Sequence, residues 1–313
     1  MATAVLAADG TPAAGLGHVA RSSAVAVALE RAGLGVRCFV LGADEPVECD
    51  GIHWRPVTDL RAARPLADAV VVVLDSYQLE PSDMEAIPEG IPIAVLQEHV
   101  APPPGAALVI AAGADPELSG PHRLCGLEYA CLRPAFWRPP QRAPAGRINR
   151  VLVTTGGGDV IYGLGAELAA TAQEALPEAE VALVRGPYGT GDAPAGIRLI
   201  AAPDSLHDEL LATDAVVTTG GQTLLEAAAL GAPAIAVVAV ENQRAQTQQL
   251  AAAGAVRVVE LPPDRLTAIL QELDGAPEQR GQLARHAQKA VDGRGAERVA
   301  ARIAALAAIT PRG

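Results

Sequence analysis

The feature that most constrains this chain is an alternation, sustained along its whole length, of short apolar runs with alanine-rich helical stretches. Such runs are typical of buried parallel strands and the stretches between them of crossover helices, so the pattern predicts an α/β fold with doubly wound parallel sheets. Half of the residues are hydrophobic but only 3% are aromatic. That composition suits helices of small side chains packed on parallel strands.

The predicted elements follow from this rhythm. In the first half we expect strands at 3–8, 36–41, 69–74, 91–96 and 107–111, and helices at 18–33, 59–66 and 81–88. In the second half we expect strands at 150–154, 180–184, 197–200, 215–218, 234–239 and 255–259, and terminal helices at 277–290 and 293–309.

The chain of 313 residues exceeds the usual size of one domain. Residues 132–144 contain four prolines, which exclude a helix or a central strand. We expect a Rossmann-like domain at 1–136, a Pro-rich linker at 137–148 and a second Rossmann-like domain at 149–313, with terminal helices that could pack back on the first. Such sheets bind ligands outside the carboxyl ends of their strands, so we expect the chemistry in strand-to-helix loops facing a cleft between the domains.

Charge and composition exclude several classes of function. The net charge of −12 and the lack of a basic run argue against a nucleic-acid partner. The four cysteines form no C-x-x-C pair, and no apolar stretch is long enough for a membrane span. Residues 1–8 lack the basic start of a signal peptide, so we expect a cytoplasmic protein, a monomer or weak dimer.

The first loop with chemical potential is GLGHVAR (residues 15–21), which opens the helix at 18–33. Its glycines permit close backbone approach, and the free N–H groups of a helix start attract anions. His18 stands in the first turn, where the helix dipole favours the neutral imidazole that a general base needs. The alternative is that His18 only caps or packs the helix.

The same string fits G-x-G-x-x-A, a form of the dinucleotide fingerprint. However, Gly15 comes well after the expected strand end, and Asp44 lies beyond the usual offset of about 20 residues. NAD or FAD is therefore not expected, and no other cofactor is indicated.

The second loop, LDSY (74–77), follows the strand at 69–74. Asp75 could anchor a neighbouring loop through backbone N–H groups or act in catalysis. The hydroxyl of Tyr77 could bond a substrate oxygen, or the ring could simply pack.

The third loop is TTGGQTLLE (218–226), which runs from a strand through a glycine pair into a helix. Backbone N–H groups from Gly220 to Gln222 and the hydroxyl of Thr223 form a phosphate-binding pattern. Glu226 shares the face of Thr223 one turn later and could accept hydrogen bonds from a ribose. A capping box is the alternative, but its spacing fits poorly.

Two further loops complete the set. Asn242 and Gln243 follow the strand at 234–239, where Asn242 could be a helix N-cap or face the cleft. Gly156 and Gly157 follow the strand at 150–154 and could line the cleft from that side.

Other catalytic classes lack their motifs. His122 and Cys125 form an isolated H-x-x-C, so no metal is expected. There is no G-x-S-x-G elbow and no Walker motif, which removes the main support for a serine hydrolase or an ATPase.

Six stretches run in order along nearly the whole chain: AADGTPAAGLGHVAR (7–21), LDSYQLE (74–80), GLEYACLRPAF (126–136), LVTTGGGD (152–159), TTGGQTLLEAAALGAP (218–233) and AVENQ (239–243). Together they resemble the GT-B superfamily, whose two Rossmann-like domains hold a nucleotide-sugar. Within it, the sequence is similar to the UDP-2,4-diacetamido-2,4,6-trideoxy-β-L-altropyranose hydrolases of pseudaminic acid synthesis and their spore-coat polysaccharide relatives.

The resemblance implies a reaction and a set of site residues. Members of that family cleave the bond between sugar C1 and UDP by direct attack of water, with inversion and without a metal, and the histidine of G-x-G-H-x-x-R is the expected base. Carried over, His18 is that base, with Tyr77 and Asn242 beside the sugar. The resemblance implies nucleotide contacts from Gly220, Gly221, Gln222, Thr223, Glu226, Gly156 and Gly157, and substrate contacts from Gly17, Arg21, Asp75 and Gln243.

This chain departs from the family pattern mainly in the first domain. Gln97 and Glu98 stand where an acidic pair is usual, and Ala111 lies in place of an Asp-Gln-Asn stretch. Ala135 replaces a glutamate and Ser22 a cysteine. We expect these changes to affect which sugar is bound more than whether the substrate is a nucleotide-sugar.

Three functions remain open. The first is hydrolysis of a UDP-linked amino-deoxy sugar or a related conjugate. The second is glycosyl transfer from the same donor to another acceptor, because hydrolases and transferases of this fold differ in what fills the position near the base. The third is a nucleotide-sugar binding protein without activity. The lack of a basic patch for a membrane-bound acceptor modestly favours hydrolysis.

Overall fold

The computed structural model describes residues 1–11, 15–63, 66, 68–76, 81–97, 105–142, 144, 146–156, 162–187 and 189–309. The chain forms two compact units, Met1–Trp137 together with Gly293–Gly313, and Arg138–Asp292. The sequence pattern divides the chain at 137–148 and assigns 293–313 to the second half. In the structure, the chain returns to the first unit at Gly293.

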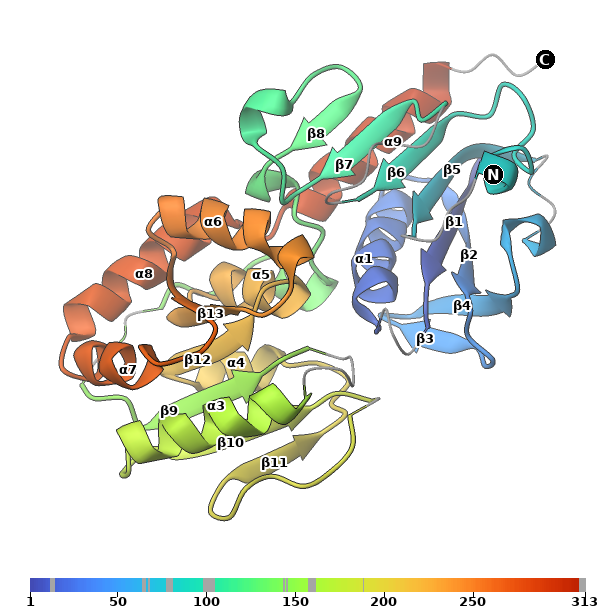
Figure 1. The fold of residues 1–313 in the computed structure, drawn as a ribbon. Helices are drawn as coiled ribbons and strands as arrows, with labels where there is room; N and C mark the ends of the chain where they lie inside the picture. Colours follow the sequence, from blue (N-terminus) through green and yellow to red (C-terminus); the bar gives the residue numbers. More distant parts are fainter. Residues whose placement is uncertain are drawn as a thin grey trace. The chain divides into compact units, whose positions relative to one another are not determined.

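The first unit is built on a twisted sheet (Figure 1). Its strands, within the described ranges, are β1 (Thr3–Asp9), β2 (Gly35–Leu41), β3 (Val47–Cys49), β4 (Ile52–Val57), β5 (Ala69–Asp75), β6 (Ile93–Leu96), β7 (Leu108–Ala111) and β8 (Arg123–Cys125). They pair in the order β3-β4-β2-β1-β5-β6-β7-β8, and only β3 and β4 run antiparallel to each other. The α/β prediction is confirmed, because the apolar runs became central strands buried on both faces.

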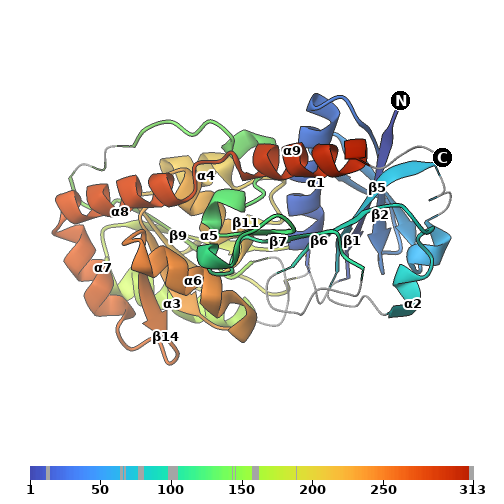
Figure 2. The same cartoon turned by 90° about the horizontal axis from the view of Figure 1, so that it is seen from above.

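Two helices from opposite ends of the chain cover one face of this sheet. α1 (Gly17–Arg31) and α9 (Gly295–Ile309) pack against each other, as Figures 1 and 2 show. Ala296, Val299, Ala300 and Ile303 of α9 are buried in the same core as the residues of α1 and β1. The first unit is therefore completed by the last helix of the chain.

The opposite face has little helical cover. The helices expected at 59–66 and 81–88 shorten to a 3-10 turn, η1 (Leu60–Ala62), and to α2 (Pro81–Met84). Pro65 and Pro88 in the sequence explain the difference, because proline disfavours the helical conformation of the residue before it. Leu60, Ala63 and Ile87 still bury their side chains against this face.

A hairpin that the apolar pattern does not predict extends the sheet. β3 and β4 are joined by Asp50 and Gly51, whose φ angles of 54° and 77° are both positive. A two-residue Asp-Gly turn of this kind matches the twist of an antiparallel pair. Arg133 donates to both carboxylate oxygens of Asp50, at 2.8 and 3.0 Å, and ties the hairpin to the segment after η3 (Leu127–Tyr129).

The second unit contains a wholly parallel sheet among its described residues. Its strands are β9 (Arg150–Thr154), β10 (Glu180–Arg185), β11 (Arg198–Ala201), β12 (Ala215–Thr219), β13 (Ala234–Val238) and β14 (Val256–Glu260), in the order β11-β10-β9-β12-β13-β14. Its helices are α3 (Tyr162–Ala175), α4 (His207–Ala212), α5 (Gln222–Ala229), α6 (Arg244–Ala252), α7 (Leu266–Asp274) and α8 (Pro277–Ala290). The strand centres match the predicted runs.

The Pro-rich segment that follows Trp137 is held on the second unit by hydrogen bonds. Arg142 donates to the carbonyl oxygens of Leu210 and Thr213 at the end of α4. The buried carboxylate of Asp274 accepts from the backbone N–H of Ile148 at 2.8 Å and from Arg147. These contacts hold the segment along the unit that it enters.

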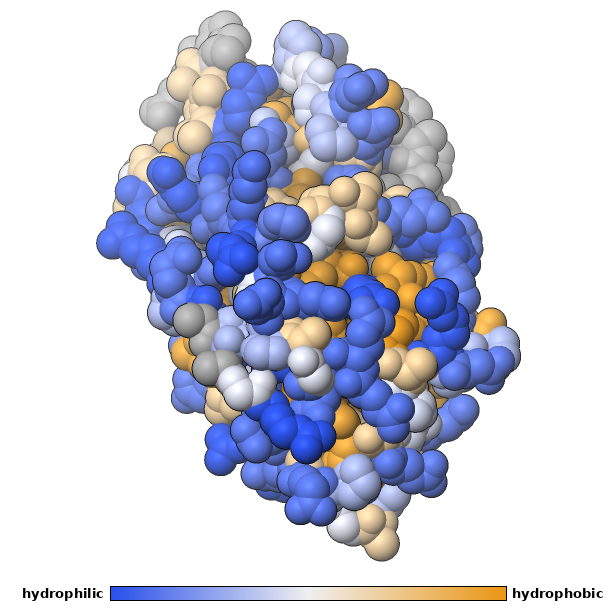
Figure 3. Space-filling view, turned by 90° about the vertical axis from the view of Figure 1, so that its left-hand side faces the viewer, coloured by the Kyte–Doolittle hydropathy of each residue, from blue (hydrophilic) through white to orange (hydrophobic). Residues whose placement is uncertain are grey.

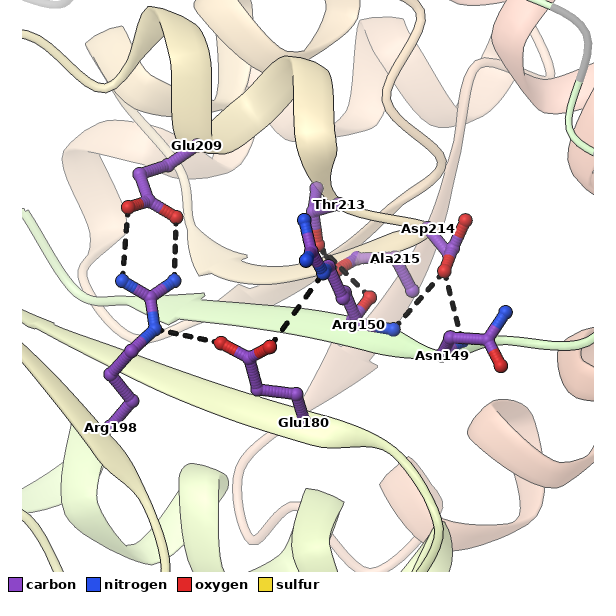
Figure 4. A network of polar contacts seen from close by, with 8 residues as sticks. All are labelled: Asn149, Arg150, Glu180, Arg198, Glu209, Thr213, Asp214 and Ala215. Carbon is purple, nitrogen blue, oxygen red and sulfur yellow. Dashed lines mark hydrogen bonds and ion pairs between the residues drawn. The ribbon is translucent and has the colours of Figure 1, made fainter.

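Charged residues tie together the amino ends of the second sheet (Figure 4). Arg198 contacts Glu209 at 2.7 Å and Glu180 at 2.8 Å, and Glu180 also faces Arg150. Exposed pairs of this kind each stabilise a fold only slightly. The network occupies the edge opposite the strand-to-helix loops, which lie at the carboxyl ends.

Polar side chains dominate the face of the molecule drawn in Figure 3, with apolar residues gathered in small patches between them. Large clusters of apolar side chains are instead buried in the cores of the two units. No helix in the described ranges is both long and apolar enough to cross a bilayer.

Candidate functional site

His18 lies where the first unit passes from β1 into α1. Gly15 has a φ of 70° and its N–H bonds the carbonyl of Thr11 at 2.9 Å, so the chain turns sharply before the helix. Leu16, the N-cap, provides no side-chain cap. The helix begins at Gly17, and His18 stands in its first turn.

The imidazole of His18 is held by a carboxylate. Its Nδ1 lies 2.6 Å from Oδ1 of Asp75, the last residue of β5. The side chain of Asp75 is fully buried and that of His18 is 6% exposed. A carboxylate only accepts, so Nδ1 carries the hydrogen and Nε2 is left with a lone pair. This is the tautomer that a general base requires.

Two further side chains of α1 bind the same carboxylate. Arg21 donates from Nε to Oδ2 at 2.7 Å and from NH2 to Oδ1 at 2.6 Å, and Ser22 donates to Oδ2 at 2.8 Å. Burial alone would raise the pKa of Asp75, but Arg21 and His18 outweigh it and hold that pKa well below its usual range. Asp75 is therefore an ionised, immobile acceptor.

The helix itself explains why these donors converge. His18, Arg21 and Ser22 stand at positions i, i+3 and i+4, which lie on one face of an α-helix. β1 lies beside β5, so that face looks onto the carboxyl end of β5. The sequence indicates Arg21 as a substrate contact, but its Nε and NH2 are directed at Asp75. In the sequence, Ser22 stands out only as a departure from the family pattern, although its spacing from His18 places both residues on one face of the helix.

The His18–Asp75 pair stands at the point where the strand order of the first sheet reverses. From β1 the chain continues to β2 on one side, and from β5 to β6 on the other. In open α/β sheets, ligands bind outside the carboxyl ends of strands at such a switch point. Gly17 begins α1 here, and its neighbourhood is open enough that an added Cβ would contact nothing within 4 Å.

The glycine turn of the second unit is tightly enclosed. A Cβ on Gly220 would lie 2.5 Å from Cβ of Gln243 and 3.0 Å from Oγ1 of Thr247. Gly221, the N-cap of α5, has a φ of 98° and its carbonyl accepts from Gln246 at 2.9 Å. Only glycine fits these two positions, and the turn presents the start of α5 at the carboxyl end of β12.

Several buried polar atoms around this turn have no hydrogen-bond partner in the described part of the chain. They are Oγ1 of Thr218, Oε1 of Gln243 and Oγ1 of Thr247. Buried polar groups are normally paired, so a group of unpaired ones beside a helix start is typical of a site that a ligand or water completes. The side chain of Gln243 lies against Gly220 and Gly221, and its predicted substrate contact stays a prediction.

The remaining residues of this loop lie on the first turns of α5. Gln222 begins the helix, Thr223 follows half-buried, and Glu226 is only 7% exposed one turn further. The predicted contacts of these three side chains with a nucleotide stay predictions.

A second glycine loop adjoins the first. β9 and β12 are neighbours, and Thr219 donates to the carbonyl of Thr155 at 3.3 Å. Gly156 follows with a φ of 91°. Gly157 and Tyr77 lie outside the described residues, as does the side chain of Asn242.

Two departures from the family pattern, Gln97 and Ala111, lie at the carboxyl ends of strands in the first sheet. Gln97 follows β6 and donates its N–H to the carbonyl of Ile110, and Ala111 ends β7 with 6% exposure. Ala135 lies in η4 (Pro134–Phe136), and Glu98 is outside the described residues. In the part of the chain that the structure describes, no group of three or more His, Cys, Asp or Glu side chains could hold a metal ion.

The fold has many counterparts among solved structures. MurG of Acinetobacter baumannii aligns with a TM-score of 0.64 at 18% identity, over 97% of this chain and 99% of that one. The glycosyltransferase VinC in complex with dTDP aligns with a TM-score of 0.63 at 19% identity, over 98% and 99%. The Streptomyces sp. SF2575 glycosyltransferase SsfS6, complexed with thymidine diphosphate, aligns with a TM-score of 0.64 at 17% identity, over 96% and 98%.

These alignments span both units and confirm the predicted GT-B fold. At such identities they establish the fold alone. No family model and no curated protein matches the chain.

Proposed function

We propose that this chain is an enzyme that transfers the sugar of a nucleoside diphosphate sugar to an oxygen nucleophile, with His18 as general base. One observation carries the proposal: the buried Asp75 carboxylate binds Nδ1 of His18 at 2.6 Å, at the switch point of a sheet in a GT-B fold. A base oriented in this way is typical of enzymes that deprotonate a hydroxyl or water.

The proposed step is a single displacement at the anomeric carbon. Nε2 of His18 takes the proton of the incoming O–H, and the oxygen forms a bond to the anomeric carbon. The bond from that carbon to the diphosphate oxygen breaks, and its electron pair leaves with the nucleoside diphosphate. Asp75 stays ionised and stabilises the imidazolium that forms. No cofactor is needed, because positioning and fixed dipoles can supply most of the rate.

The second unit holds the nucleotide in this proposal. The start of α5, with the N–H groups from Gly221 onward, would bind the diphosphate, and Thr223 and Glu226 would bind the nucleotide beyond it. The unpaired atoms of Thr218 and Thr247 beside the turn support a ligand there. From the family resemblance we add Gly156 and Gly157 on the nucleotide side, and Tyr77, Asn242 and Gln243 near the sugar.

Two acceptors remain candidates, and different observations favour them. The structural alignments to VinC and SsfS6 favour a hydroxyl acceptor, since both are glycosyltransferases and each aligns over at least 96% of this chain. The six ordered sequence stretches favour water, as in the UDP-diacetamido-sugar hydrolases. We give glycosyl transfer the first place, because the alignments rest on the whole fold.

The decisive experiment measures nucleotide release. The purified protein is incubated with UDP- and dTDP-linked amino-deoxy sugars, with and without a panel of hydroxyl acceptors, and free nucleotide and sugar products are quantified. Release that requires an acceptor supports the transferase, and release with free sugar in its absence supports the hydrolase. Binding without release under either condition would overturn the proposal in favour of a binding protein.

A further inference from the structure

We propose that Ser22 is a positioning residue: its hydroxyl fixes the Asp75 carboxylate and thereby keeps His18 in the tautomer of a base. This inference rests on the proposed function. Ser22 is 1% exposed and donates to Oδ2 of Asp75 at 2.8 Å. The partner of the Ser22 hydroxyl is the carboxylate, so we infer that its effect on the base passes through Asp75.

The acceptor positions of Asp75 are filled among the described residues. Oδ1 accepts from Nδ1 of His18 and NH2 of Arg21, both at 2.6 Å, and Oδ2 accepts from Nε of Arg21 and from Ser22. An ionised carboxylate offers about four such positions. Removing the hydroxyl leaves one of them empty in a site from which bulk water is excluded, since Asp75 is fully buried.

The neighbouring guanidinium makes this vacancy chemically important. NH2 of Arg21 lies 3.3 Å from Nδ1 of His18, and both atoms carry hydrogen when Nδ1 donates to Asp75. If the carboxylate rotates away, NH2 can donate to Nδ1 instead. That contact favours the other tautomer, in which Nε2 carries the hydrogen and can no longer accept a proton. Ser22 therefore prevents the wrong tautomer.

The chain offers a matched control next to this residue. Ser23 is 0% exposed and accepts from Nε1 of Trp54 at 2.8 Å, on a neighbouring part of α1 that does not contact Asp75. Ser22→Ala and Ser23→Ala each remove a buried hydroxyl and its hydrogen bonding from the same helix. A merely structural role for Ser22 predicts the same behaviour from both variants.

The experiment compares the two full-length variants with the wild type. ¹⁵N NMR of the histidine ring nitrogens should show the Nδ1–H tautomer of His18 in the wild type and in Ser23→Ala, and a substantial Nε2–H population in Ser22→Ala. His18→Gln, which lacks these signals, identifies them. Steady-state kinetics use a nucleotide-sugar that the wild type turns over. Ser22→Ala should lower kcat about tenfold and leave KM unchanged, because the loss of a hydrogen bond that supports a functional side chain commonly has an effect of this size.

An unchanged tautomer in Ser22→Ala, or a kcat equal to that of Ser23→Ala, would overturn the inference. If the wild type turns over no nucleotide-sugar, the proposed function fails, and the tautomer comparison still decides whether Ser22 positions the ring.

Discussion

A single carboxylate, that of Asp75, connects His18, Arg21 and Ser22 at the switch point of the first sheet. Nδ1 of His18 lies 2.6 Å from Oδ1 of this carboxylate, and in the function that we propose Nε2 takes the proton of the acceptor. Burial alone would raise the pKa of Asp75, but Arg21 and His18 hold it well below its usual range, so the carboxylate stays ionised at physiological pH.

His18→Ala should therefore lower turnover by about a hundredfold or more, since a general base contributes about 10² to 10⁴. Nucleotide affinity should remain, because we propose that the second unit binds the nucleotide. Steady-state nucleotide release and calorimetric titration with UDP or dTDP measure the two quantities. A variant that keeps most of its turnover would remove His18 from the mechanism.

At this scale, the sequence predicts single residues better than it predicts their partners. The glycine turn and helix start identified His18 from local spacing alone. Its contact with Asp75 joins residues 57 positions apart and depends on β1 pairing with β5, which no local pattern reveals. For the same reason, no local pattern reveals that Arg21 and Ser22 donate to this carboxylate.

The turn before α5 gives a prediction at the scale of an element. Gly221→Ala should weaken nucleotide binding about tenfold or more, because a φ of 98° is strained for alanine and the added Cβ would lie 3.1 Å from Nε2 of Gln243. Gly196→Ala is the control, since its φ of 83° is equally strained but its Cβ would meet nothing within 4 Å. Calorimetric titration with the free nucleotide measures the affinity of both variants. Equal affinities of Gly221→Ala and Gly196→Ala would contradict a nucleotide contact at this turn.

The contacts of Arg147 and Ile148 with Asp274, the last residue of α7, give a second prediction at the scale of an element. The hydrogen bond from Arg147 lowers the pKa of Asp274 by more than burial raises it, and the N–H of Ile148 lowers it further. Its contribution to stability is therefore present above about pH 4 and is lost as pH falls through the lower folded pKa. Asp274→Asn should cost about 1–2 kcal/mol at pH 7 and flatten the pH dependence of unfolding between these limits.

Denaturant unfolding at several pH values tests this expectation. Asp68→Asn is the comparison, because Asp68 pairs with Arg37 at 2.6 Å but is 66% exposed, where an ion pair contributes little. Identical stability and pH slope in the two variants would contradict an anchoring role for Asp274.

Elements were predictable where the apolar pattern was continuous. β1 and β5 are runs of Ala, Val and Leu buried on both faces, and they appear within a residue of their expected ends. β4 (IHWRPV) mixes polar and apolar residues, because only one of its faces is buried, and was missed. The helices expected at 59–66 and 81–88 are shorter in the structure. Each expected range contains a proline, Pro65 or Pro88, that disfavours the helical conformation of the residue before it.

At the scale of the whole molecule, the important feature is that the first core contains side chains from both ends of the chain. Ile303 of α9 is 0% exposed and lies in the cluster formed by α1 and β1. The sequence predicts two Rossmann-like halves but not which one receives the last helix, since 293–309 has the same alanine-rich pattern as any other helix here.

Ile303→Ala should destabilise the first unit by about 3 kcal/mol through the cavity it leaves. Hydrogen exchange should accelerate in β1 and β5, hundreds of residues away in sequence, and stay unchanged in β9 and β12. Leu270→Ala, in the core of the second unit, should give the reverse pattern. Faster exchange in β12 than in β1 after Ile303→Ala would contradict this division of the molecule.

The return of the chain at Gly293 also orders events during synthesis. Residues 138–292 are synthesised before α9, so the second unit can fold while α9 is still being translated. β1 and α1 are synthesised earlier, but their apolar surface is covered only when α9 has been made. The unit in which we propose the base is thus begun before the other unit and completed after it, so we expect a chain arrested before α9 to keep the nucleotide affinity that we propose for the second unit but to lack turnover.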